Sequence, residues 1–239
     1  MSPEHDALLK QLLAARRPSD GRFDPKGYLG TPSAFLNVPV PARRKIAREW
    51  LRSHRAWALA DTLALVDELV RAETHEEKSL GLLILEGVGR GRRPFGPEHV
   101  DRWLDHLVGW AEVDSLCQST FGPDDLLGGW PAWSGFIRRL ARDANINKRR
   151  AALVLLVKPA GKSPDPRLAA LAFETVEALK SEREVIITKA VSWLLRALSE
   201  HHAPNVRHYL EAEGPTLPAI AVRETRAKLD TGRKTRRPL

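Results

Sequence analysis

Residues 103–121 of the chain read Trp-Leu-Asp-His-Leu-Val-Gly-Trp-Ala-Glu-Val-Asp-Ser-Leu-Cys-Gln-Ser-Thr-Phe, and the rest of the sequence is organised around them. The first part has apolar residues at the spacing of a helix face turned towards a core: Leu104, Leu107 and Val108. Gly109 loosens the backbone, and Trp110 and Asp114 follow four residues apart. In a helix, this spacing places the indole and the carboxylate on one side. A buried tryptophan beside a capping or surface aspartate is the alternative interpretation.

The length and composition are those of a globular protein. The chain has 239 residues, of which 43% are hydrophobic and 28% charged, enough to bury a substantial core. It has no apolar run near the roughly 20 residues of a membrane span, and its N-terminus lacks the pattern of a secretory signal. A single cysteine, Cys117, excludes an intrachain disulfide framework and a four-cysteine metal site. We expect a soluble, cytoplasmic monomer that needs no metal and no other cofactor.

The charge balance points to a polyanionic partner. Lys and Arg total 38 against 30 acidic residues, which gives a formal net charge of +8. Such an excess is typical of nucleic-acid-binding proteins, although many basic proteins bind no nucleic acid. The seven tryptophans, against two tyrosines, suggest that some indoles lie on a binding surface.

Helical periodicity dominates the chain, and no segment alternates like a strand. We expect helices over residues 4–16, 43–52, 58–71, 76–88, 97–108, 131–142, 147–157, 164–180, 184–199, 204–210 and 218–229. Taken in pairs, they recur at about the 40-residue period of helical-hairpin repeats, which predicts an all-α solenoid with a concave face. A compact helical bundle is the competing architecture. We expect one domain over residues 1–229 and a basic, disordered tail over 230–239.

Two basic sites could contact a nucleic-acid backbone. Arg149 and Arg150 precede an apolar run, residues 151–157, that predicts a buried helix. Arg150 lies opposite the apolar face and should point out of the core, so the pair could clamp a phosphate at the helix N-terminus. Gly89-Arg90-Gly91-Arg92-Arg93 is a second basic cluster, for which solvated charge is the simpler interpretation.

The expected helix over residues 184–199 carries a tryptophan on a cationic flank. At 100° per residue, Trp193 falls outside the apolar stripe, with Lys189 and Arg196 as its neighbours. This arrangement suits a groove that follows a sugar–phosphate backbone, and packing against an adjacent repeat is the alternative. The run Ala160-Gly161-Lys162-Ser163 lacks the first glycine of a phosphate-binding loop and follows a helix, so we expect an ordinary loop there.

Three blocks of sequence resemble the AlkD-like alkylpurine DNA glycosylases of the DNA alkylation repair superfamily, which are built from HEAT-like helical repeats. They occur in family order and include Tyr28 to Leu36 with Val40-Pro41-Ala42-Arg43-Arg44, then Trp110-Ala111-Glu112-Val113-Asp114-Ser115, then Arg149-Arg150-Ala151-Ala152 with Lys189-Ala190-Val191-Ser192-Trp193-Leu194-Leu195-Arg196. One departure is Gly109, because the family often has an aromatic residue immediately before the first cleft tryptophan.

The resemblance implies a role for each matching position. Asp114 would be the catalytic carboxylate, Trp110 and Trp193 the cleft tryptophans, Arg150 the backbone-contacting arginine and Tyr28 a DNA-facing tyrosine. The implied activity is hydrolysis of the N-glycosidic bond of cationic alkylated purines, of the 3-methyladenine and 7-methylguanine type, in duplex DNA. A non-catalytic helical-repeat module that binds DNA or protein remains the alternative.

Overall fold

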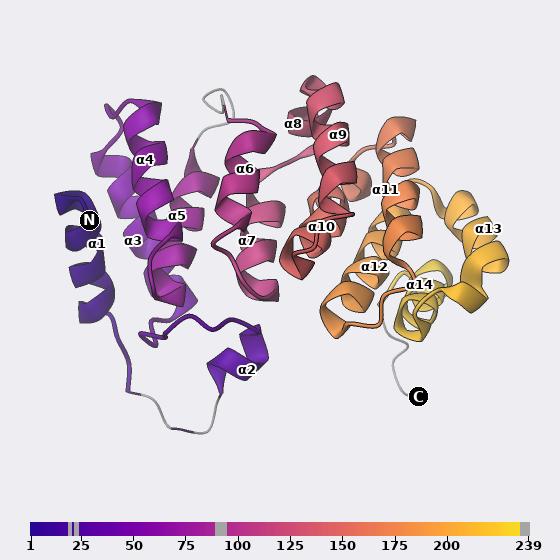
Figure 1. The fold of residues 1–239 in the computed structure, drawn as a ribbon, viewed down its shortest axis with the longest axis horizontal. Helices are drawn as coiled ribbons and strands as arrows, with labels where there is room; N and C mark the ends of the chain where they lie inside the picture. The colour runs from indigo at the N-terminus through magenta and orange to yellow at the C-terminus, as the bar shows by residue number, and fades with distance from the viewer. Residues whose placement is uncertain (19–20, 22–23, 89–94, 235–239) are drawn as a thin grey trace. The chain divides into compact units, whose positions relative to one another are not determined.

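The computed structural model describes residues 1–18, 21, 24–88 and 95–234, and most of these residues are in helices (Figure 1). In this part of the chain the only β-type pairing is one isolated bridge between Ala34 and Thr74. The all-α prediction is therefore confirmed. Chain contacts define two compact units, Met1–Thr120 and the part from Phe121 onward. The expectation of one domain over residues 1–229 stays a prediction.

The first unit is built around one central helix. Its elements are α1 (Pro3–Ala14), α2 (Pro25–Leu29), α3 (Val40–Ser53), α4 (Leu59–Val70), α5 (His75–Gly87), α6 (Pro97–Leu104) and α7 (Trp110–Thr120). Helix α5 packs against α3, α4 and α7, and α1 rests on α3 and α4. Alternate helices thus stack on one another, as expected for helical hairpins in which no single pair can bury its own apolar face.

The second unit repeats this scheme. Its elements are α8 (Pro123–Gly128), α9 (Trp130–Leu140), α10 (Ile146–Lys162), α11 (Pro166–Leu179), α12 (Val185–Leu198), α13 (Ala203–Glu213), a short 3₁₀ turn (Gly214–Thr216) and α14 (Ala219–Thr231). Helix α10 packs on α12, and α12 packs on α14. Every residue from Ala151 to Leu156 is fully buried, which confirms that the apolar run forms a central helix.

Three local predictions were wrong. Helix α6 ends at Leu104 rather than at Val108. The His106 N–H donates to the Trp103 carbonyl at 3.0 Å, and the Val108 N–H donates to the Glu112 carboxylate at 3.0 Å instead of continuing the helix. One-turn helices, α2 and α8, form where no helix was predicted, and each has a proline in its first turn.

The third error concerns residues 160–163, which we expected to form a loop. Helix α10 continues to Lys162, past Pro159 in its interior. Pro159 and Ala160 are both buried, and the Ser163 N–H closes the last turn on the Pro159 carbonyl at 3.1 Å. Burial of this turn outweighs the cost of a proline, which removes one helical hydrogen bond.

Candidate functional site

The start of α7 and the end of α2 meet through their backbones. Gly109 immediately precedes α7 and has φ +84°. A Cβ atom at Gly109 would lie 2.4 Å from the carbonyl oxygens of both Leu29 and Gly30, a distance that no side chain can occupy. Only glycine therefore permits this conformation and this close approach.

The approach brings together two of the predicted site residues, Tyr28 and Trp110. The Trp110 indole N–H donates to the Tyr28 carbonyl at 2.7 Å, and the two rings meet edge to face with centroids 5.5 Å apart. Tyr28 is 62% exposed and Trp110 is half-buried. The pair therefore presents aromatic surface to solvent while its backbone position is fixed.

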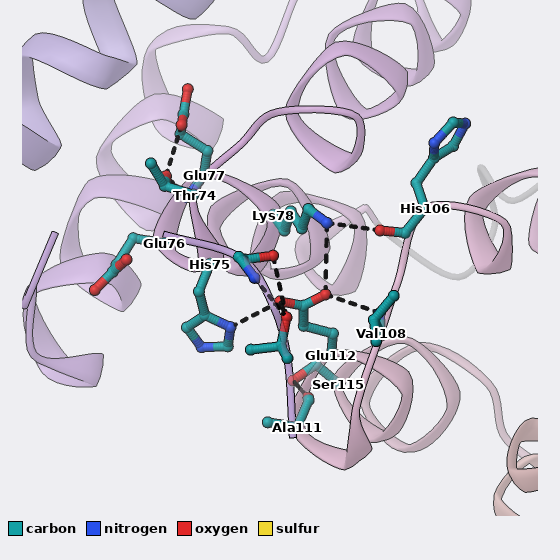
Figure 2. Close-up of polar contacts among 12 residues, drawn as sticks. Thr74, His75, Glu76, Glu77, Lys78, His106, Val108, Ala111, Glu112 and Ser115 are labelled. Atoms are coloured by element: carbon teal, nitrogen blue, oxygen red, sulfur yellow. Dashed lines mark hydrogen bonds and ion pairs between the residues drawn. The ribbon is translucent and has the colours of Figure 1, made fainter. Parts of the chain in front are cut away.

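A buried carboxylate, Glu112, holds the surrounding segments together, as Figure 2 shows. Its side chain is fully buried. One oxygen accepts from Thr31 Oγ1 at 2.9 Å and lies 3.1 Å from His75 Nδ1. The other accepts from the Val108 N–H at 3.0 Å and lies 3.7 Å from Lys78 Nζ. Glu112 thus ties α7 to α5 and to the segments that follow α2 and precede α7.

Burial and hydrogen bonding act on Glu112 in opposite directions. Burial alone raises the pKa of this carboxyl group, because it disfavours the charged form. Hydrogen bonds from His75, Val108 and Thr31, together with the Lys78 charge, outweigh burial and leave the pKa of Glu112 below its ordinary value. Glu112 is therefore a carboxylate whose charge is satisfied inside the protein.

Anchoring Glu112 also sets the rotation of α7. Successive helical residues are about 100° apart, so Trp110 and Asp114 lie within about 40° of each other, on the side opposite Glu112. Asp114 is half-exposed, one turn after Trp110. Because both residues lie in α7, Trp110 and Asp114 share one side of the helix, as the spacing predicted.

In the second unit, Arg149 and Arg150 make protein contacts. Arg149 forms an ion pair with Glu182, with Nε 2.6 Å from the carboxylate, and its guanidinium also donates to the Asp143 and Ala144 carbonyls. Arg150 is 5% exposed and donates to the Ile186 carbonyl in the first turn of α12. The expectation that Arg150 points out of the core was wrong, because this carbonyl draws the guanidinium inward.

The residues predicted on α12 have different surroundings. Lys189 is exposed and Trp193 is half-buried. Arg196 lies 3.6 Å from the Glu224 carboxylate and donates to Ser192 Oγ at 3.4 Å. Burial lowers the pKa of Arg196 and Glu224 partly offsets this effect. Within this trio, Lys189 is the side chain most open to a partner.

The sequence reasoning missed the buried charges of the first turn of α5. In this turn His75, Glu76, Glu77 and Lys78 are all buried. Glu76 accepts from the Leu36 and Val38 N–H groups, and Glu77 lies 2.8 Å from His5 Nε2. Four consecutive charged or polar residues normally indicate a solvated surface, so the sequence offered no signal of their burial.

The remaining site predictions are placed as follows. The cluster Gly89–Arg93 lies outside the described residues. Among the residues that are described, no group of three or more His, Cys, Asp or Glu side chains is arranged to hold a metal ion. None of the helices described has both the length and the apolar character needed to cross a membrane. The first unit contains Tyr28, Trp110 and Asp114. The second unit contains the other predicted site residues, Arg149, Arg150, Lys189, Trp193 and Arg196.

Comparison with known proteins identifies the family. The fold is similar to that of a structure described as a predicted DNA alkylation repair enzyme from Enterococcus faecalis, with a TM-score of 0.70 and 17% sequence identity over 96% of this chain and 97% of that one. No curated protein matches the chain. Residues 9–229 match the family described as DNA alkylation repair enzyme. The chain therefore belongs to the DNA alkylation repair enzyme family.

Proposed function

We propose that this protein is a DNA glycosylase that hydrolyses the N-glycosidic bond of cationic alkylated purines in duplex DNA. Membership of the family supports a role in DNA repair. The observation that carries the glycosylase proposal is the difference in exposure between the two carboxylates of α7. Glu112 is buried, whereas Asp114 is half-exposed and lies on the same side of the helix as Trp110.

The proposed chemistry matches these residue types. Alkylation of a purine at N3 or N7 leaves the base cationic, so the base departs with the bonding electron pair as a neutral molecule. The sugar then develops oxocarbenium character, which the Asp114 carboxylate stabilises electrostatically. A water molecule adds to C1′, and its proton passes to the Asp114 carboxylate or to solvent. The Trp110 indole face attracts the same positive charge.

The test is substitution of Asp114 by Asn, which keeps the shape and removes the charge. Single-turnover release of 3-methyladenine and 7-methylguanine from methylated duplex DNA should fall by at least about 100-fold, while DNA binding persists. Asp61→Asn, a change at an exposed aspartate in the first turn of α4, is the matched control and should leave base release unchanged.

A purely structural Asp114 predicts a different result. If Asp114 is only a partly exposed residue within α7, its substitution would change stability by about 1 kcal/mol at most and leave excision per folded molecule intact. The thermal midpoint is therefore measured beside the rate. Undiminished excision by a folded Asp114→Asn protein would reject the catalytic role and favour a non-catalytic module that binds DNA or protein.

A further inference from the structure

A second concave site lies in the first unit, away from Glu112. It is a pocket of about 460 Å³ between the C-terminal end of α3, the start of α4 and the C-terminal end of α5. His75, which contacts Glu112, begins α5, and Gly87, which lines the pocket, ends it. At 1.5 Å per residue the two ends of α5 are about 18 Å apart, so this pocket is separate from the site around Trp110.

The pocket carries positive charge that the protein itself does not neutralise. Arg48, Arg52 and Arg55 line it, are exposed, and form no ion pair with any described residue. None of the described residues that line the pocket is acidic. The nearby carboxylate of Glu4 accepts from the Trp50 indole N–H at 2.7 Å and lies 3.1 Å from His54 Nε2.

Three exposed arginines elsewhere in the chain are neutralised by the protein, in contrast to those of the pocket. Arg102, Arg138 and Arg207 each lie within 3.4 Å of a carboxylate oxygen, belonging to Asp67, Glu174 and Asp230. The three pocket arginines follow one another at about one helical turn, over the end of α3 and the turn after it. They therefore form a concentration of charge that is open to an anion.

An aromatic wall stands beside these arginines. Trp50 and His54 are stacked, with ring centroids 4.4 Å apart. Trp57 is perpendicular to both rings and lies 5.2 Å from Trp50 and 4.8 Å from His54. A ring can be this close to both members of a stack only if it stands alongside the stack. Because Trp57 is also half-exposed, part of its indole is available to a ligand.

We propose that this pocket binds one unpaired nucleotide of a DNA strand, with its phosphate on the arginines and its base against Trp57. A basic surface beside an exposed aromatic ring is the combination that proteins use to hold single-stranded nucleic acid. The proposal takes DNA as the substrate class, as the function proposed above does, and adds a contact with an unpaired part of the strand. It does not depend on the excision chemistry at Asp114.

Fluorescence anisotropy with labelled oligothymidine tests the proposal. Trp57→Ala should weaken binding by roughly 5- to 150-fold, the range found when a base loses its aromatic stacking partner. The double substitution Arg52→Ala with Arg55→Ala should weaken binding and reduce the salt dependence, by about 0.7 in the slope for each lost phosphate contact. This double variant changes only exposed side chains, so it keeps the test informative if Trp57→Ala unfolds.

Controls separate this proposal from its alternatives. Arg71→Ala removes one exposed arginine at the opposite end of α4 and should bind oligothymidine like the wild type. The pocket variants should excise bases from blunt methylated duplex at the wild-type rate.

Oligothymidine binding that is absent from the wild type, or unchanged in the pocket variants, would overturn the proposal. An equal loss of affinity for blunt duplex would also overturn it, by showing a general backbone contact. A wild-type protein that binds oligothymidine through this pocket but releases no base would reject the glycosylase proposal alone.

Discussion

At the scale of single residues, Glu112 links the stability of the first unit to pH. Its folded pKa lies below the ordinary value, so the unfolded chain takes up the proton first as the pH falls. The stabilisation is complete above the unfolded pKa of about 4.3 and is lost as the pH falls through the folded pKa. Glu112→Gln should therefore lower the free energy of unfolding at pH 7 by about 3 kcal/mol, and by less in acid.

Urea unfolding at pH 7 and at about pH 3, below the unfolded pKa, measures this difference. The buried groups that face Glu112 are His75 and Lys78, and the substitution leaves both without their carboxylate partner. Glu211→Gln, on the exposed surface of α13, should change stability at neither pH. An effect of Glu112→Gln that is the same at both pH values would mean that shape, and not charge, accounts for its role.

The sequence anticipated some residue-level features and not others. The W-x-x-x-D spacing placed Trp110 and Asp114 on one side of a helix, because that relation depends only on helical geometry. The inward turn of Arg150 depends on the Ile186 carbonyl, which lies 36 residues further along the chain. Periodicity contains no information on such long-range contacts. Arg150→Ala should therefore reduce stability as well as any DNA affinity, which a thermal midpoint measured beside a binding isotherm will show.

At the scale of elements, the N-terminal cap of α5 should matter because this helix is the centre of the first unit. The Thr74 hydroxyl accepts from the Glu77 N–H at 3.2 Å and donates to the Glu77 carboxylate at 2.6 Å. Thr74→Ala should reduce the free energy of unfolding by about 1 kcal/mol. In the control Thr188→Ala, the lost hydroxyl contacts only a carbonyl of its own helix, α12, and stability should be almost unchanged. If both variants shift the denaturant midpoint from the wild-type value by the same amount, the capping role is contradicted.

Helix positions were predictable to the extent that local signals determine them. Local signals made three helices predictable. Helices α6 and α11 each begin with a proline, and α10 contains a long apolar run. The end of α6 was not predictable, because the segment after it is held by the contact of the Val108 N–H with Glu112, a residue of the next helix. Helix α2 was not predicted because glycines and prolines around it are typical of a loop. It begins at Pro25, and Gly30 ends it in a left-handed conformation.

At the scale of the whole molecule, the net charge of +8 predicts that duplex-DNA affinity falls with salt, as phosphate contacts release counterions. Lys189→Ala should weaken binding and reduce the slope of log affinity against log salt by about 1. The control Arg207→Ala removes the same charge from an arginine that is paired with Asp230, and should leave the slope unchanged. Affinity that is the same at low and high salt would contradict electrostatic binding. Equal slopes for Lys189→Ala and the wild type would remove Lys189 from the interface.

The backbone contact at Gly109 limits how this protein can be engineered. Designs that copy residues from relatives into each position would introduce a side chain at position 109 wherever a relative has a residue other than glycine immediately before the position of Trp110. Here its first carbon would overlap the carbonyl oxygens of Leu29 and Gly30, and its backbone would have to keep φ +84°. Gly30, on the other side of this backbone contact, has φ +68°. A Cβ atom added to Gly30 would lie 3.7 Å from the Gly109 Cα, an ordinary van der Waals distance. A relative's residue at position 109 can therefore be transplanted only together with the loop at residues 29 and 30 that accommodates it.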